Sequence, residues 1–219
     1  MDKILLVAPS TDPIKTTEGI ISYANKISEF ADFLHCDIMD AKFVANKTYS
    51  YDVVKEINSN TLLPLDVHLM VENPTSVIDK YINAGANIVT VHYEAYSNKK
   101  QMIKDLKRIR KMGALSGLSL KPATDVNEIF PYLSYCDLVL VMSVEPGKSG
   151  QMFLASAYRK VEALNEIRKT YNSNFKIEVD GGVKPEIASN LKMLGADIVV
   201  SGNYVYKSLS LIDAINSLK

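Results

Sequence analysis

The sequence predicts a single α/β domain, a parallel (β/α)8 or TIM barrel that occupies residues 1–219. Eight short apolar runs, rich in valine, isoleucine and leucine, recur along the chain, and segments with helical periodicity lie between them. From Lys3 to Asp197, the seven steps between the starts of these runs average about 28 residues, which is close to what one strand, one helix and two short loops need. Eight such units without a composition break favour a closed barrel over a doubly wound sheet, which usually has fewer strands.

The eight predicted strands are short and rich in β-branched residues, which disfavours a helical interpretation of them. In chain order they read KILLVAPS, DFLHCDIMD, LDVHLMVE, NIVTVHYE, ALSGLSLK, DLVLVMSV, FKIEVDGG and DIVVSGN, and they begin at Lys3, Asp32, Leu65, Asn87, Ala114, Asp137, Phe175 and Asp197.

Helix signals fill the intervals between these strands. Residues 16–31 open on threonines suited to capping and keep isoleucine and alanine on one stripe. The segments NPTSVIDKYINAGA and KPEIASNLKMLGA each carry an early proline, Pro74 and Pro185, and a late glycine, Gly85 and Gly195, which is the usual start and stop of a helix. The near copies INAGANIV and KMLGADIV mark two helix ends that run into strands.

The composition excludes several classes of function. Basic and acidic residues balance at 25 each, and the basic run over 99–111 is interleaved with apolar residues at helical spacing, so we interpret it as the solvated face of a helix and expect no nucleic-acid partner. No apolar run approaches a membrane span or a secretory signal, so we expect a cytoplasmic protein with no membrane partner. Cys36 and Cys136 lie in strand-like runs and are expected as buried free thiols.

Ionisable side chains collect at the carboxyl ends of the strands, where the active site of such a barrel forms. All three histidines, His35, His68 and His92, lie there. Because side chains alternate between the two faces of a strand, four strands aim polar residues or methionines into the barrel: His35, Asp37 and Met39; Asp66, His68 and Met70; Thr90 and His92; Glu178 and Asp180. Buried groups of this kind must pair, bind a metal, or both.

Two imidazoles and two carboxylates, His35, Asp37, His68 and Asp180, make an N2O2 set suited to one divalent transition metal. A network of hydrogen bonds and ion pairs without metal is the alternative, and the ligand types alone leave both open. We expect His92 to support the site by hydrogen bonding near Glu94 rather than as a ligand.

Glycines supply a second signal in three successive loops, EPGKSGQMF, VDGGVKPE and VSGNYVYKS. Backbone N–H groups at such turns hold phosphate, and the loops after the last two strands are the usual place for it in a barrel. An anionic, phosphorylated substrate is therefore expected. Met39, Met70 and Met142 end three strands and serve either as adaptable packing or as a polarizable lining of the site.

These stretches closely resemble the ribulose-phosphate 3-epimerase family. The similarity spans nearly the whole chain in the family's order, and the combination of H-x-D-x-M-D, D-V-H-L-M and V-D-G-G is specific. The resemblance implies one divalent metal (Zn, Fe, Mn or Co) on His35, Asp37, His68 and Asp180, with Asp37 and Asp180 as acid and base on opposite faces of the sugar. It implies C3 epimerisation of D-ribulose 5-phosphate to D-xylulose 5-phosphate through an enediolate, in the pentose phosphate pathway, by a homo-oligomer.

The resemblance also implies the groups that bind the phosphorylated ketose. Ser10 would contact it, as would His35 and His68, and Met39, Met70 and Met142 would line the pocket. Phosphate would lie on the backbone of the turns formed by Gly147, Lys148, Ser149, Gly150, Gly181, Gly182, Gly202 and Asn203.

The chain departs from the family pattern around the pocket, not at the ligands. The departures are Ala41, Ala45, Lys47, Lys148, Ser149, Asn203 and the stretch TDPIK after Ser10. They leave open a hexulose-phosphate 3-epimerase acting on allulose 6-phosphate. A non-catalytic phosphate-binding barrel is the alternative of another class, and the Asp37 and Asp180 pair argues against it.

Overall fold

Eight parallel strands form the wall of a barrel in the computed structural model, which describes residues 4–219. Lys3, where the first apolar run begins, lies outside the described residues. The strands are β1 (Leu6–Pro9), β2 (Leu34–Met39), β3 (Leu65–Met70), β4 (Ala86–His92), β5 (Leu115–Leu120), β6 (Leu138–Met142), β7 (Lys176–Asp180) and β8 (Ile198–Ser201). They pair in the order β1-β8-β7-β6-β5-β4-β3-β2, and a parallel bridge between Ser10 and His35 brings β1 to β2. The predicted (β/α)8 barrel is confirmed.

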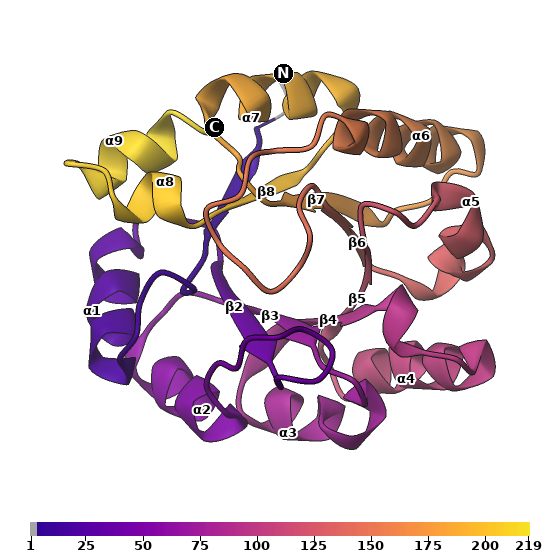
Figure 1. Cartoon of the computed structure of the whole chain (residues 1–219), viewed down its shortest axis with the longest axis horizontal. Coiled ribbons are helices and arrows are strands. Elements are labelled where there is room, and N and C mark those ends of the chain that lie inside the picture. The colour runs from indigo at the N-terminus through magenta and orange to yellow at the C-terminus, as the bar shows by residue number, and fades with distance from the viewer. Residues whose placement is uncertain (1–3) are drawn as a thin grey trace.

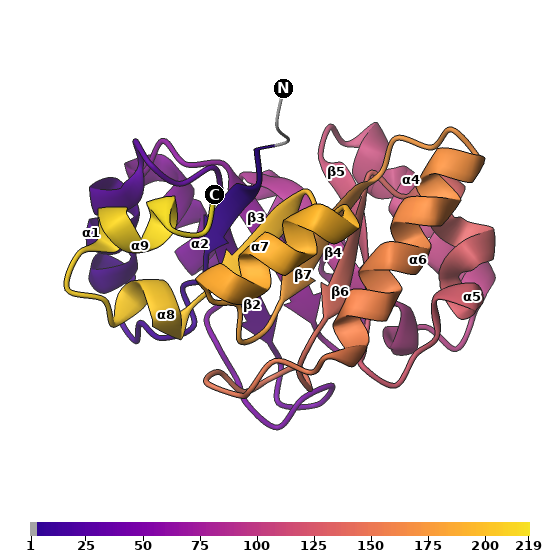
Figure 2. The same cartoon turned by 90° about the horizontal axis from the view of Figure 1, so that it is seen from above.

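Helices surround this wall (Figure 1). They are α1 (Thr17–Ile27), α2 (Tyr51–Asn60), α3 (Ile78–Asn83), α4 (Lys99–Lys111), α5 (Val126–Ile129), α6 (Ser156–Thr170), α7 (Pro185–Leu194), α8 (Asn203–Tyr206) and α9 (Leu211–Asn216), with 3-10 turns η1 (Pro74–Ser76), η2 (Tyr93–Ala95) and η3 (Phe130–Tyr135). The loops that follow β2 and β6 project from one end of the barrel, opposite the N-terminus (Figure 2).

The punctuation predicted for the helices is present at α1 and α7. The Thr16 side chain accepts a hydrogen bond from the Gly19 amide at 3.1 Å and caps α1. Gly195 takes a φ of 110° beyond the end of α7, in the left-handed region that favours glycine. The basic run over 99–111 forms α4, with an apolar face buried against the barrel.

The expected helix over 73–86 is not continuous. It starts as the turn η1 and becomes α3 only at Ile78. Contacts with α4 provide the reason, because Arg108 donates to the Thr75 carbonyl at 3.1 Å and the Thr75 hydroxyl donates to Asp105. These tertiary bonds hold the first turn out of α-helical geometry.

The two faces of the sheet divide the core as the alternation predicts. Outward residues such as Cys36, Ile38 and Val67 are buried against the helices, and Cys36 and Cys136 are buried free thiols as expected. A second, inner cluster contains Ile88, Leu140 and Ile198 inside the barrel. Of the helices described over residues 4–219, none is long and apolar enough to cross a membrane.

Candidate active site

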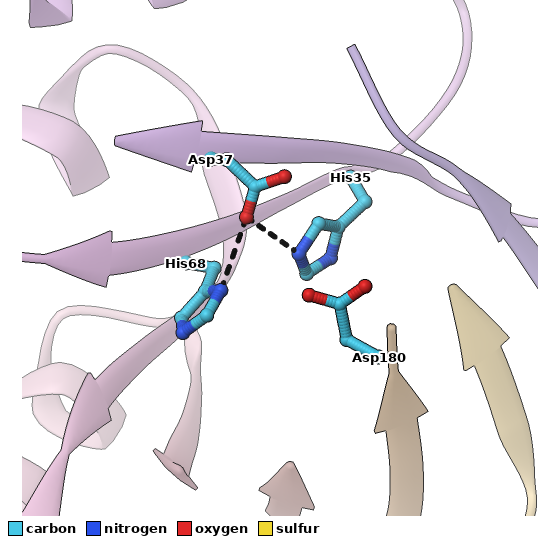
Figure 3. A group of neighbouring side chains, drawn as sticks. All are labelled: His35, Asp37, His68 and Asp180. Carbon is cyan, nitrogen blue, oxygen red and sulfur yellow. Dashed lines mark hydrogen bonds and ion pairs between the residues drawn. The ribbon is translucent and has the colours of Figure 1, made fainter. Parts of the chain in front are cut away.

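Four side chains from three strands meet at the carboxyl ends of β2, β3 and β7 (Figure 3). They are His35, Asp37, His68 and Asp180, and each offers a ligand atom within 4.8 Å of the others. The two histidines and Asp37 are buried, and Asp180 is partly exposed to the cavity. The structure thus brings together the four residues expected as metal ligands.

Asp37 is the centre of this cluster. Its Oδ1 lies 3.2 Å from His35 Nε2 and 3.1 Å from His68 Nδ1, and its Oδ2 accepts a hydrogen bond from the Ser10 hydroxyl at 2.9 Å. Burial disfavours the carboxylate, but the two imidazoles outweigh burial and hold the pKa of Asp37 well below its usual range. Asp37 is therefore ionised at neutral pH and is available to bind a cation.

Asp66 and Glu178 fix His35 from behind, inside the barrel. His35 Nδ1 lies 2.5 Å from Asp66 Oδ2, and Glu178 lies close to both groups. Burial and the charge of Asp66 raise the pKa of Glu178 well above its usual value, so its carboxyl is protonated and hydrogen-bonds to Asp66. Asp66 therefore accepts the Nδ1 proton of His35, and His35 Nε2 faces the cluster.

A second chain of hydrogen bonds orients His68. Burial, the largest influence, lowers the pKa of His92 to about 4, whereas hydrogen bonds from His92, Thr124 and Lys121 overcome burial and lower the pKa of Glu94 to about 2. Neutral His92 therefore donates from Nδ1 to the Glu94 carboxylate at 3.1 Å. Its Nε2 accepts from His68 Nε2, 2.9 Å away, which leaves His68 Nδ1 facing Asp37. His92 supports the site near Glu94, as predicted.

This arrangement fits a divalent cation. His68 presents the unprotonated Nδ1 to Asp37 Oδ1, so two lone pairs face each other at 3.1 Å. His35 Nε2 lies 3.2 Å from the same oxygen and makes no hydrogen bond among residues 4–219. Although burial opposes it, the charges of Asp66 and Asp37 raise the pKa of His35 well above its usual value, so without a metal Nε2 carries a proton. A divalent cation beside Asp37 Oδ1 would replace that proton and satisfy both imidazoles.

Asp180 differs electrostatically from Asp37 although the two share one cluster. Burial and the negative charge of Asp37 raise the pKa of Asp180 to about 7. Two carboxylates with pKa values pushed in opposite directions suit an acid and a base that act on one carbon. Figure 3 shows the Asp180 carboxyl extending from β7 toward His35, across from Asp37 on β2.

A cavity of about 610 Å³ opens above the four residues. Ser10, Asp37, Asp180 and all three predicted methionines line it, together with the glycine turns after β6, β7 and β8, Lys148, Ser149 and Asn203. His35 and His68 are fully buried beneath the floor and do not line it, so any contact they make with a ligand passes through the cluster.

Close approach of backbone requires glycine in two of these turns. A Cβ on Gly182 would lie 2.7 Å from the Phe153 amide nitrogen, and Gly182 has a φ of 64°. A Cβ on Gly147 would lie 2.6 Å from Val44, at a φ of 97°. Both residues turn backbone toward the cavity, as a phosphate cradle requires.

Sequence reasoning missed several residues of the cavity wall: Asp12, Lys184, Tyr204 and Lys207. Asp12 could have been found, because it follows Ser10 just beyond a strand end, where site residues collect. The lysines carried no signal of this kind, since lysine is common on any surface.

The family comparison agrees with the sequence pattern. A sequence profile described as the ribulose-phosphate 3 epimerase family matches residues 7–206. A ribulose-phosphate 3-epimerase of Aquifex aeolicus (strain VF5) is 38% identical over 189 residues, which cover 86% of this chain and 84% of that protein. One of Helicobacter pylori (strain ATCC 700392 / 26695) is 38% identical over 216 residues, or 97% and 96% of the two chains.

Solved structures support the fold alone. The tryptophan synthase α-subunit of Pyrococcus furiosus superimposes with a TM-score of 0.72 at 16% identity, covering 100% of this chain and 99% of that one. A 3-hexulose-6-phosphate synthase superimposes with a TM-score of 0.67 at 18% identity, covering 98% and 97%.

Proposed function

Because the chain belongs to the ribulose-phosphate 3-epimerase family, we propose that its cavity interconverts D-ribulose 5-phosphate and D-xylulose 5-phosphate. The chain is an enzyme that epimerises C3 of a phosphorylated ketose. One observation carries this proposal: Asp37 and Asp180 face one cavity from different strands, with pKa values displaced in opposite directions.

Asp37 and Asp180 would exchange the C3 proton between the two faces of the sugar. Asp37, ionised, takes the C3 proton of D-ribulose 5-phosphate, and the electrons move to the C2 carbonyl oxygen to give an enediolate. Asp180, whose pKa of about 7 leaves it partly protonated at neutral pH, returns a proton to the opposite face. The Ser10 hydroxyl, 2.9 Å from Asp37 Oδ2, holds that carboxylate in place. The reverse reaction exchanges the two roles.

His35, Asp37, His68 and Asp180 would hold the metal. When bound, a divalent cation supplies electrostatic stabilisation of the enediolate oxygen. Asp66 keeps His35 Nε2 directed at the cluster, and the His92 and Glu94 pair does the same for His68 Nδ1. The N2O2 donor set accepts Zn²⁺, Fe²⁺, Mn²⁺ or Co²⁺.

The far end of the cavity would bind the phosphate. Backbone groups of Gly147–Gly150, of Gly181 and Gly182, and of Gly202 with Asn203 surround it, with Lys148 and Ser149 at its rim. The methionines Met39, Met70 and Met142 would form the apolar wall near the reacting carbons. We further propose that residues 1–219 act as one catalytic domain, in the cytoplasm and as a homo-oligomer.

Deuterium exchange tests the reaction directly. Purified protein is mixed with ribulose 5-phosphate in D2O, and C3 deuterium is followed by NMR before chelation, after chelation and after each of the four metals is added back. We expect exchange that chelation abolishes and metal restores. Exchange with allulose 6-phosphate alone would indicate the hexulose-phosphate enzyme, and exchange with neither sugar would indicate a binding protein.

A further inference from the structure

Asp12 is a third carboxylate of the cavity, and the proposed proton transfers give it no role. It lies in the loop after β1, where its amide donates to the Ser10 hydroxyl at 3.1 Å, and that hydroxyl donates to Asp37 at 2.9 Å. The backbone of Asp12 is therefore tied to the Asp37 side of the site.

The same loop also contacts the glycine turns. The Ser149 hydroxyl, in the loop after β6, donates a hydrogen bond to the Asp12 side chain. A Cβ on Gly202, after β8, would lie 3.5 Å from Ser10 and 3.6 Å from Pro13, so the two loops pack in direct contact. Asp12 thus lies between the Asp37 and Asp180 pair and the turns that would hold phosphate.

The charges around Asp12 limit what it can recognise. Burial and the charge of Asp37 raise the pKa of Asp12, while the Ser149 hydroxyl and Lys15 oppose them, and the side chain stays partly exposed to the cavity. A carboxylate in this position repels a phosphate dianion, which has no proton to donate. A sugar hydroxyl does have one, and a hydrogen bond from a neutral hydroxyl to a carboxylate is among the stronger neutral-to-charged pairs.

The order of groups in the cavity identifies which hydroxyl this is. With C3 between the two carboxylates and the phosphate on the glycine turns, the carbon next to C3 on the phosphate side faces Asp12. On the basis of the proposed function, we propose that Asp12 accepts a hydrogen bond from the C4 hydroxyl of the ketose phosphate. Asp12 then selects for ketoses that carry a donor at C4.

A cycle of two enzymes and two substrates tests this contact. The metal-loaded wild type and Asp12→Leu are each assayed by C3 deuterium exchange with ribulose 5-phosphate and with its 4-deoxy analogue. With ribulose 5-phosphate, we expect Asp12→Leu to lower kcat/KM about 10- to 100-fold. With the 4-deoxy analogue, we expect Asp12→Leu and wild type to differ by less than about 3-fold, because the contact is already missing.

Two further variants separate the contact from charge and folding. Asp12→Asn keeps an acceptor oxygen and should recover part of the activity lost in Asp12→Leu. Glu18→Gln removes an exposed carboxylate from α1, outside the cavity, and should leave both substrates unchanged. The melting temperature of each variant reports whether it folds like the wild type.

The outcomes are distinguishable. An Asp12→Leu enzyme that loses the same factor on both substrates, or loses nothing on ribulose 5-phosphate, overturns the role of Asp12 while leaving the epimerase assignment intact. Absence of exchange by the wild type with ribulose 5-phosphate, with each of the four metals, overturns the proposed function itself and the Asp12 contact with it.

Discussion

Replacing Asp180 with asparagine should make the metal-free protein more stable while abolishing epimerisation. The folded-state pKa of Asp180 is about 7, against 3.8 for an unperturbed aspartate, because burial and Asp37 disfavour its charge. The folded state therefore holds this proton more tightly than the unfolded chain does. The resulting loss of stability begins as pH rises above 3.8 and is complete above about pH 7.

The size of the effect follows from the pKa difference. At about 1.4 kcal/mol per pH unit, the difference between 3.8 and about 7 corresponds to about 4 kcal/mol. Asp180 is partly exposed, so solvent screening reduces this to about 2 kcal/mol. For a chain of 219 residues, about 2 kcal/mol raises the melting temperature by roughly 4–8 °C. At pH 5.5, the gain should be about half of that at pH 8.5.

Thermal unfolding in EDTA at pH 5.5 and 8.5 measures this gain. Asp137→Asn is the matched control with the opposite sign, because bonds from Arg110 and Ser116 overcome burial and lower the pKa of Asp137, so its loss should destabilise the protein at both pH values. The C3 exchange rate of metal-loaded Asp180→Asn should fall by about 10²-fold or more. A melting temperature at pH 8.5 that falls as far as in Asp137→Asn would refute the electrostatic argument, and an active Asp180→Asn would refute the two-carboxylate mechanism.

Three other predictions concern the groups behind the ligands. Asp66→Asn should weaken metal binding about 10- to 100-fold, measured by calorimetry, because it removes the acceptor that orients His35; unchanged affinity would contradict that role. Glu94→Gln should weaken metal binding in the same way through His92 and His68, and a metal affinity equal to that of the wild type would rule out the relay. Metal affinity should rise with pH up to and through about pH 7, because the raised pKa values of two ligands make protons compete with the metal; calorimetry in buffers of different ionisation enthalpy should show proton release, and none would contradict it.

The alternation of side chains made the ligand cluster predictable from sequence. A polar residue every second position in an otherwise apolar strand identifies an inward face, and strand ends identify the mouth, so His35 and Asp180 could be assigned without coordinates. The buried pair of Asp66 and Glu178 could not be assigned as partners, because barrel register brings these distant positions together. The break in the helix at Val77 depends on tertiary contacts to α4, which no local pattern records.

The departures from the family pattern were visible in the sequence, but their contacts were not. Ala41 takes a φ of 59°, in the left-handed region, so alanine is kept there at a cost of about 1 kcal/mol relative to glycine. Asn46 donates to the Gly147 carbonyl at 2.6 Å, which joins the loop after β2 to the loop after β6. Loop-to-loop contacts of this kind depend on the closed barrel.

The unequal burial of the two carboxylates has a consequence for isotope exchange. Asp37 is only 6% exposed and is bonded to its neighbours, whereas Asp180 opens onto the cavity. A hydron on Asp180 should therefore equilibrate with solvent within one turnover, while one on Asp37 is shielded. In D2O, xylulose 5-phosphate formed from ribulose 5-phosphate should gain deuterium at once. Ribulose 5-phosphate formed in the opposite direction should lag, so the washout of label distinguishes the two faces of one sugar.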